Sequence, residues 1–431
     1  MRSGWKEGDA LKAGGYSAGF SGLDKGIPSG FEFASGAGVL EGALLFPLML
    51  LKESALAHNL EAMARWCANN GFLLAPHGKT TMTPRLFERQ LGAGAWAITV
   101  ATASQAAVCA AMGVPRILIA NQIAGRANLR SLAAIMRENP GLEILCLVDS
   151  VEGVEFLGAE WRDARVGRPL GVFAEVGHRG WRTGARSAPD ALRVCSEVGN
   201  YADVLTLRGV EGFEGLARGE DSAQEGRIAR EFLSAIAEVG QALADSAPAR
   251  GGSREPLILS AGGSAFLDAV WEFGRQMQPR FQILLRSGCY ITHDHGQYAQ
   301  KNIAAHQRAD SRADLPEFRP ALELWSHVQS RPEEGLAILN FGKRDCPYDA
   351  GLPIPLYALG ASGGRVDLRH AAVAATNDQH AYLKGSGLDA LRIGDAVCCG
   401  VSHPCTAFDK WRVLPVVDDD YRLLEIYRTY F

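Results

Sequence analysis

The sequence lacks the features that mark nucleic-acid and membrane-binding proteins. Its formal net charge is -4, and its 44 lysines and arginines are scattered rather than gathered into stripes. Its most apolar segment, residues 38–51, contains Glu41 and Pro47 and is shorter than the roughly 20 apolar residues that span a bilayer. We therefore expect neither nucleic acid nor a membrane as a partner.

The sequence patterns of several cofactor classes are also missing. There is no Gly-x-Gly-x-x-Gly fingerprint and no Walker-type loop, so nothing indicates a dinucleotide or P-loop nucleotide site. The nine cysteines are odd in number, and no two of them form a Cys-x-x-Cys pair. The chain also begins without the apolar core of a signal peptide. These absences favour a cytoplasmic protein with free thiols.

What the sequence does have is a regular series of short apolar runs, each followed by a helix-like stretch. Continuous apolar runs, rather than alternating ones, are typical of strands buried on both faces. Eight of them predict a parallel (β/α)8 TIM-type barrel, with an open doubly wound sheet as the alternative. The runs are residues 72–75, 95–101, 116–120, 143–149, 170–176, 205–211, 256–261 and 281–286.

The character of the sequence changes after about Thr292. Alternating apolar and polar residues, separated by Gly, Asp and Asn turns, predict a small all-β domain. We therefore expect an N-terminal extension over residues 1–46 that packs on the β-domain, the barrel over residues 47–295, and the C-terminal β-domain over residues 296–431.

One lysine stands where barrels gather their catalytic groups. The segment APHGKTTMTP (residues 75–84) follows the first apolar run, and Thr83-Pro84 predicts the start of a helix. Lys79 is therefore expected in a strand-to-helix loop at the carboxyl end of the barrel. An amine there can form a Schiff base if its pKa is lowered, whereas a surface lysine is the alternative.

Two loops near the end of the barrel suit a phosphate group. Gly262-Gly263-Ser264 follows the seventh run, and Arg286-Ser287-Gly288 ends the eighth. Backbone N–H groups without an obstructing Cβ can cradle an anion. TIM barrels frequently bind phosphate between the loops after strands seven and eight, so the two loops support each other.

A histidine and a cysteine near the C-terminus could share a metal ion. His403 and Cys405 are two residues apart, and in a strand both would point to one face and could hold zinc. Two ligands are too few for a structural site but leave positions open; a packed thiol beside a hydrogen-bonded histidine is the alternative. Residues 292–296 (THDHG) are a weaker metal candidate, whose aspartate is expected to cap a turn. Three arginines after the fifth run either bind anions or are simply solvated: Arg179, Arg182 and Arg186.

Five motifs, in this order, resemble those of the bacterial D-serine dehydratase (D-serine deaminase) and D-threonine aldolase family: APHGKTTM, EVGHRGWRTG, AGGSA, LRSGCYITHD and IGDAVCCGVSHPCTAF. These are fold-type III pyridoxal-phosphate enzymes with the alanine racemase fold. The resemblance runs from about Pro47 to the C-terminus. It implies a pyridoxal-phosphate enzyme, usually a homodimer, that acts on a small-molecule D-amino acid at a barrel mouth facing a β-domain.

The resemblance also assigns roles to individual residues. Lys79 matches the Schiff-base lysine and becomes the expected catalytic base. The other expected cofactor-binding residues are His77, Arg182, Gly262, Gly263, Ser264, Arg286, Ser287 and Gly288. His403 and Cys405 match the metal pair, which implies zinc, with manganese as the alternative.

The reaction that the resemblance implies is a zinc-dependent β-elimination of water from D-serine or a related β-hydroxy-D-amino acid. Its products are pyruvate or another 2-keto acid, and ammonia. Cys405 favours this dehydratase branch, because aldolases of the family often carry an aspartate there. A D-threonine aldolase giving glycine and acetaldehyde is the alternative; an amino-acid racemase and a non-catalytic pyridoxal-phosphate-binding protein are weaker ones. Glu211 departs from the family, in which a tyrosine is expected at that position.

Overall fold

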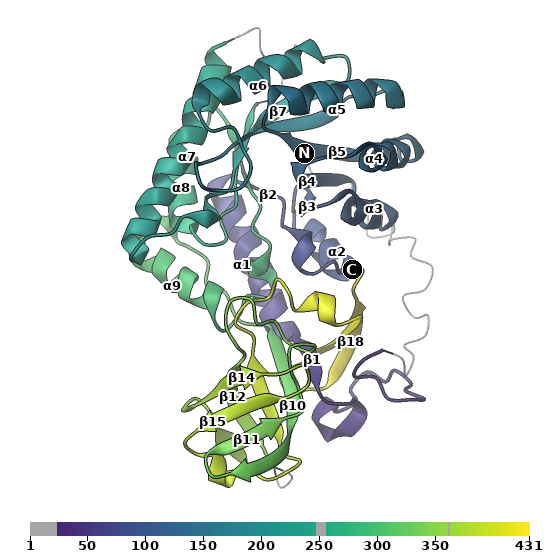
Figure 1. Cartoon of the computed structure of the whole chain (residues 1–431), viewed down its shortest axis with the longest axis vertical. Coiled ribbons are helices and arrows are strands. Elements are labelled where there is room, and N and C mark those ends of the chain that lie inside the picture. The colour runs from purple at the N-terminus through teal and green to yellow at the C-terminus, as the bar shows by residue number, and fades with distance from the viewer. Residues whose placement is uncertain (1–23, 247–255, 361–362) are drawn as a thin grey trace.

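Two sheets organise the chain in the computed structural model, which describes residues 24–246, 256–360 and 363–431 (Figure 1). The first is an eight-stranded parallel sheet and the second a ten-stranded sheet. In Figure 1 the parallel sheet and its helices lie above the second sheet. Residues 1–23 of the expected N-terminal extension lie outside the described residues.

The parallel sheet is the predicted barrel, and all eight predicted strands are confirmed. Their order is β2-β9-β8-β7-β6-β5-β4-β3. The sheet curls until its outer strands meet, since the backbone N–H groups of Trp96 and Thr99 donate to Leu74 O (2.7 Å) and Pro76 O (2.9 Å). The strands are β2 (Leu73–Leu74), β3 (Ile98–Val100), β4 (Arg116–Gln122), β5 (Glu143–Val148), β6 (Leu170–Val176), β7 (Leu205–Gly212), β8 (Ile258–Ala261) and β9 (Gln282–Leu285).

Helices alternate with these strands and cover the outside of the barrel (Figure 1). Several begin at a side-chain cap, as at Ser150, Ser187 and Asp221, each of which accepts the N–H three residues on. As predicted, one helix starts at Pro84. The helices are α1 (Glu53–Asn70), α2 (Pro84–Gly92), α3 (Ala103–Ala111), α4 (Arg126–Glu138), α5 (Val151–Ala164), α6 (Ala188–Asn200), α7 (Ser222–Asp245), α8 (Leu267–Met277) and α9 (Gln297–Arg308).

The second sheet is the antiparallel C-terminal domain, joined by one strand from the start of the chain. β1 (Leu48–Lys52) pairs antiparallel with β10 and parallel with β17. The sequence assignment placed this segment in the barrel span; its fully buried apolar run suits either sheet, and the pairing puts it in the second. The other strands are β10 (Leu322–Glu333), β11 (Leu336–Leu339), β12 (Ile354–Leu359), β13 (Arg365–Asp367), β14 (Ala371–Thr376), β15 (Ala381–Gly385), β16 (Ala396–Gly400), β17 (Val413–Val417) and β18 (Leu423–Arg428).

The described part of the N-terminal extension lies against this second sheet. Ala37 O accepts the N–H of Leu423 at 2.9 Å, and Val39 N–H donates to Tyr421 O at 3.0 Å. Residues 24–46 therefore meet the β-domain near β18. Among the helices in the described part of the chain, none combines the length and apolar character needed to cross a membrane.

The two sheets are tied together close to the barrel mouth. Tyr430 N–H donates to Met82 O at 2.9 Å, so the C-terminus lies beside the loop that carries Lys79, as Figure 1 shows near α2. His295 N–H donates to Val401 O at 2.9 Å, which joins the segment after β9 to the loop after β16. The loops at the carboxyl ends of the barrel strands thus meet the β-domain.

Candidate active site

Lys79 lies in a short 3-10 turn, Gly78–Thr80, between β2 and α2. The turn packs tightly, because a Cβ at Gly78 would lie 2.6 Å from the ring of Phe87 and 3.0 Å from Ile98. Lys79 is half-buried there. The structure therefore places this lysine in the strand-to-helix loop at the carboxyl end of the barrel, where the sequence predicted it.

Three cations surround His77, the residue two before Lys79. Burial lowers the pKa of His77 well below its usual value, and the charges of Lys79, Arg286 and Arg182 lower this pKa further. The Nδ1 atom of His77 is buried and has no hydrogen-bond partner. Four of the residues expected to bind the cofactor thus lie near one another, and their charges are partly balanced by Glu211, which pairs with Arg286.

Arg286 is held rigidly at the end of β9. Its Nε donates to Ser260 Oγ at 3.0 Å, its Nη2 donates to Gly212 O at 2.8 Å, and it forms an ion pair with Glu211. The pKa of Glu211 is raised to about 7, chiefly by burial, because the lowering effect of Arg286 is smaller and Glu175 opposes it. This pair fills the position where the family was expected to carry a tyrosine.

Of the three arginines after the fifth barrel strand (β6), one faces the site and one holds the loop. The Arg182 guanidinium lies 4.6 Å from the ring centre of Phe213. Arg186 donates to the carbonyls of His178 and Thr183, both at 2.9 Å, and to that of Trp181 at 3.3 Å. Arg186 therefore stabilises the loop itself.

The two expected phosphate loops lie together, but a carboxylate takes two of their amides. The N–H groups of Gly262 and Gly263 donate to Glu214, at 2.9 and 2.6 Å, instead of facing an open site. Glu214 is fully buried, so it needs these donors. Ser287 Oγ donates to Gly262 O at 2.9 Å, which joins the two loops.

Gly288 must be a glycine, because a Cβ there would lie 2.4 Å from His77 O. This contact brings the end of β9 against the Lys79 loop. A small cavity of about 10 Å³ is lined by Ser264, Ser287 and Cys289, among others. Serines from both expected phosphate loops therefore border one cavity.

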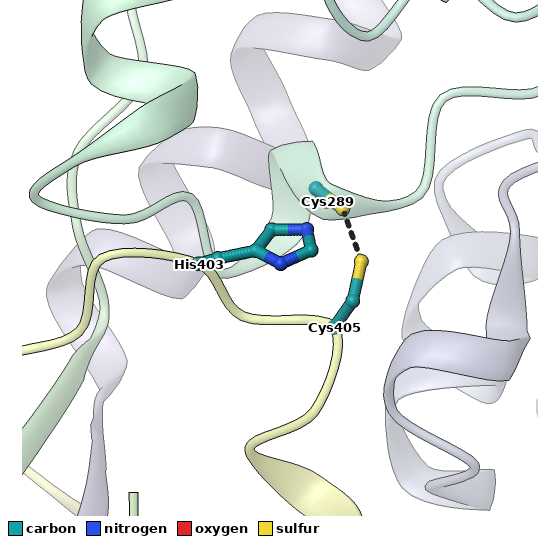
Figure 2. Close-up of side chains that lie close together, drawn as sticks. All are labelled: Cys289, His403 and Cys405. Carbon is teal, nitrogen blue, oxygen red and sulfur yellow. Dashed lines mark hydrogen bonds between the residues drawn. The ribbon is translucent and has the colours of Figure 1, made fainter. Parts of the chain in front are cut away.

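The end of β9 also brings a third candidate metal ligand to His403 and Cys405. The ligand atoms of Cys289, His403 and Cys405 all lie within 4.8 Å of one another. The two sulfur atoms are 3.3 Å apart, and the His403 ring faces them in Figure 2. The sequence singled out the other two residues but not Cys289; its signal was its position directly after Arg286-Ser287-Gly288.

His403 is oriented by a carboxylate that no sequence pattern indicated. Its Nδ1 lies 2.7 Å from Asp349 Oδ2, while Thr406 Oγ1 donates to Asp349 Oδ1 at 2.9 Å. The other ring nitrogen of His403, Nε2, is therefore available to a metal ion on the side of Cys289 and Cys405. A metal-binding histidine usually donates its second N–H to such a carboxylate.

The pKa values of His403 and Cys405 are shifted in opposite directions. The hydrogen bond with Cys289, together with His403, holds the pKa of the Cys405 thiol well below its usual range. Burial lowers the pKa of His403, but Cys405 and Asp349 outweigh it and raise that pKa to about 9.

One threonine connects this cluster to the lysine. Thr80 Oγ1 lies 3.5 Å from the sulfur of Cys405 and 3.9 Å from that of Cys289. Thr80 directly follows Lys79 in the chain. The turn that carries Lys79 therefore contacts the cluster through Thr80.

Residues 292–296, the weaker metal candidate, have a structural role. Asp294 accepts the N–H groups of Gly296 at 3.0 Å, Tyr298 at 2.9 Å and Ala299 at 3.1 Å. This is the predicted capping role, at the start of α9. All nine cysteines are free thiols, as expected.

Comparisons in sequence identify relatives of this chain. Residues 321–417 match the family described as "Putative serine dehydratase domain". The 3-hydroxy-D-aspartate aldolase of Paracoccus denitrificans (strain Pd 1222) is 24% identical over 76% of this chain and 80% of the relative. The D-threonine aldolase of Arthrobacter sp is 25% identical over 86% of this chain and 89% of the relative.

Solved structures establish the fold. The D-threonine aldolase of Filomicrobium marinum superimposes with a TM-score of 0.74 at 21% identity, covering 92% of this chain and 98% of that one. For the D-threo-3-hydroxyaspartate dehydratase of Delftia sp. HT23 the TM-score is 0.67 at 20% identity, with 90% and 98% covered. Alanine racemase of Clostridium difficile 630 superimposes at 0.57 and 12% identity, with 89% and 98% covered. The chain thus has the alanine racemase fold, is related in sequence to the 3-hydroxy-D-aspartate and D-threonine aldolases, and carries a domain of the serine dehydratase family at residues 321–417.

Proposed function

We propose that the chain is a pyridoxal-phosphate-dependent lyase that eliminates water from a β-hydroxy-D-amino acid, such as D-serine, with a zinc ion held by His403 and Cys405. The products are a 2-keto acid, pyruvate in the case of D-serine, and ammonia. One observation carries this proposal: Thr80 contacts the Cys405 sulfur at 3.5 Å, which sets the metal-type cluster beside the Lys79 loop. A substrate bound to one can therefore reach the other.

The residues at the barrel mouth fit pyridoxal phosphate. Lys79 offers the amine that the cofactor's aldehyde requires. The buried, unpartnered Nδ1 of His77 is a polar atom in need of a ligand. Arg182 and Arg286 supply positive charge near His77, and Ser264 borders the small cavity beside the two loops.

Different residues of the chain would act on the Cα proton and on the β-hydroxyl group of the substrate. Bound pyridoxal phosphate would withdraw electrons from the substrate Cα, and bound zinc would polarise the β-hydroxyl. Lys79 would accept the Cα proton through its amine. His403 and Cys405 would hold the hydroxyl side of the substrate at a fixed distance from that amine, and the β-domain would limit access of water.

The metal ligands support elimination over carbon–carbon cleavage. A cysteine-to-alanine mutant of D-threo-3-hydroxyaspartate dehydratase has been solved in a metal-free form. In this chain, Cys405 is the cysteine that we propose as a metal ligand. The curated relatives are aldolases, so cleavage of the Cα–Cβ bond is the second candidate function.

Product analysis separates these two functions. We expect the purified chain, loaded with pyridoxal phosphate and zinc, to convert D-threonine into 2-oxobutanoate and ammonia, because elimination breaks the Cβ–O bond. Glycine with acetaldehyde would instead establish an aldolase, and inversion to L-amino acid would establish a racemase. The proposal fails if D-threonine, D-serine and 3-hydroxy-D-aspartate all yield no keto acid.

Asp349 should control metal affinity without touching the metal. We expect Asp349→Asn to weaken zinc binding by about 10–100-fold, the usual effect of losing an outer-shell carboxylate, because His403 loses the partner of its Nδ1. Competition with a chromophoric chelator measures this. Asp378→Asn, at an exposed aspartate of the same domain, is the matched control. Unchanged affinity in Asp349→Asn would show that the carboxylate does not orient the ligand.

A further inference from the structure

We propose that Cys289 is a third protein ligand of the metal, so that the barrel and the β-domain together form a Cys2His site with one open position that selects zinc over manganese. The identity of the molecule that takes the open position rests on the proposed function. The ligand set itself follows from the residues that meet at this point.

The geometry places three donors around a common centre. Cys289 comes from the turn Cys289–Ile291 after β9, whereas His403 and Cys405 come from the loop after β16 (Figure 2). In a tetrahedral site with zinc–sulfur bonds of about 2.3 Å, ligand atoms lie roughly 3.8 Å apart. The sulfur atoms are 3.3 Å apart and all three donors lie within 4.8 Å, so shifts of at most about 1 Å would accommodate an ion.

The surroundings of Cys289 resemble those of a metal ligand rather than those of a thiol that only fills space in a core. It is 5% exposed, yet its sulfur faces polar groups: Cys405, and Thr80 Oγ1 at 3.9 Å. It also lines the pocket shared with Ser264 and Ser287. By contrast, Cys346 is fully buried in the β-domain and donates to Gly342 O. Cys289 therefore lies beside both the other two candidate ligands and this small cavity.

The number and type of the ligands favour zinc over manganese. Three protein ligands and an open position are the usual arrangement of catalytic zinc, and the set of two cysteines and one histidine is among those known for it. Thiolate ligands favour zinc, whereas manganese favours carboxylate, carbonyl and water oxygens. A second sulfur therefore shifts the preference of the site further from manganese than His403 and Cys405 alone would.

Cobalt substitution tests the ligand set without any turnover. The holoenzyme is stripped of metal with a chelator under reducing conditions, and Co²⁺ is added while difference spectra are recorded against the metal-free sample. We expect thiolate-to-cobalt charge-transfer absorption that falls by about half in Cys289→Ser and in Cys405→Ser, because each removes one of two thiolates. Cys346→Ser, the matched control, should keep the wild-type spectrum.

Metal competition tests the selectivity. We expect Cys289→Ser to lower zinc affinity by on the order of 100-fold or more, beyond the effect of an outer-shell change, and to leave manganese affinity nearly unchanged. Equal charge-transfer intensity and equal zinc affinity in wild type and Cys289→Ser would overturn the proposal. So would a Cys289–Cys405 disulfide, detected by mass spectrometry, in metal-loaded active protein.

The wild-type protein provides a test that no folding defect can obscure. X-ray absorption at the zinc edge should count two sulfur ligands at about 2.3 Å, and a count of one would reject Cys289 as a ligand. The outcome is independent of the proposed reaction. If two sulfur ligands are found but the protein has no lyase activity, the proposed ligand set stands and the proposed function fails. If one sulfur ligand is found and the protein is fully active, the proposed function stands and Cys289 is not a ligand.

Discussion

Replacement of Lys79 by alanine is expected to abolish both the visible absorption of the bound cofactor and the lyase activity. The absorption depends on a covalent bond to the amine, which alanine cannot form. Loss of the proton acceptor alone typically costs about 10²–10⁴-fold in rate, and loss of the anchor adds to this. Absorption spectra of the reconstituted variant and keto-acid release from D-serine measure the two effects.

Two further variants sharpen this test. Lys79→Arg keeps the positive charge beside His77 but should lose the absorption band, which separates the covalent role from the electrostatic one. Lys384→Ala, at an exposed lysine of β15, should behave as wild type. A band that persists in Lys79→Ala would mean that another amine anchors the cofactor.

Replacement of Cys405 by alanine should leave the cofactor in place but remove the activation of the substrate hydroxyl group by the metal. We expect the visible band to remain, because Lys79 is untouched. Turnover of D-serine should fall on the order of 10²–10³-fold, since a metal that polarises a leaving hydroxide contributes several kcal/mol and each 1.4 kcal/mol is a factor of ten. The steady-state rate in excess zinc is the measurement, and His403→Ala should give the same result.

Chelation provides the counter-test. Wild-type enzyme treated with a chelator should lose activity to the level of Cys405→Ala and regain it with zinc, while Cys405→Ala should respond to neither. Cys346→Ser should follow wild type throughout. If chelated and untreated wild-type enzyme turn over at equal rates, the metal has no part in the reaction.

The barrel could be predicted because its strands carry an unambiguous signal. A strand such as β6, which is buried along all seven residues, is apolar at every position except Glu175, and this pattern can be recognised without knowledge of the neighbouring strands. β1 has the same continuous burial, and for that reason its sequence could not say to which sheet it belongs. Pairing is decided by contacts with β10 and β17, which lie hundreds of residues away along the chain.

The candidate site divides along the same line. The loop position of Lys79 was predictable because a strand and a helix start bracket it locally. His403 and Cys405 were expected in a strand, but they lie in the loop after β16, where their proximity depends on the fold of that loop. Asp349 is more than 50 residues from His403 along the chain. Glu214 lies 48 residues before Gly262, whose backbone N–H donates a hydrogen bond to it. No local pattern links such partners. Cys289 joins Cys405 across 116 residues, so its role emerges only when the two sheets meet.

The position of β1 has a consequence for how the protein must be made. β1 leaves the ribosome before the barrel, yet its partners β10 and β17 are synthesised after it. Domains generally fold from the N-terminus as they emerge, but the β-domain must wait for the last part of the chain while its central strand stays unpaired. A fragment starting at residue 296 would lack that strand and expose two open edges, a template for aggregation. The barrel is thus an insertion within the β-domain, and the β-domain cannot be produced as an independent unit.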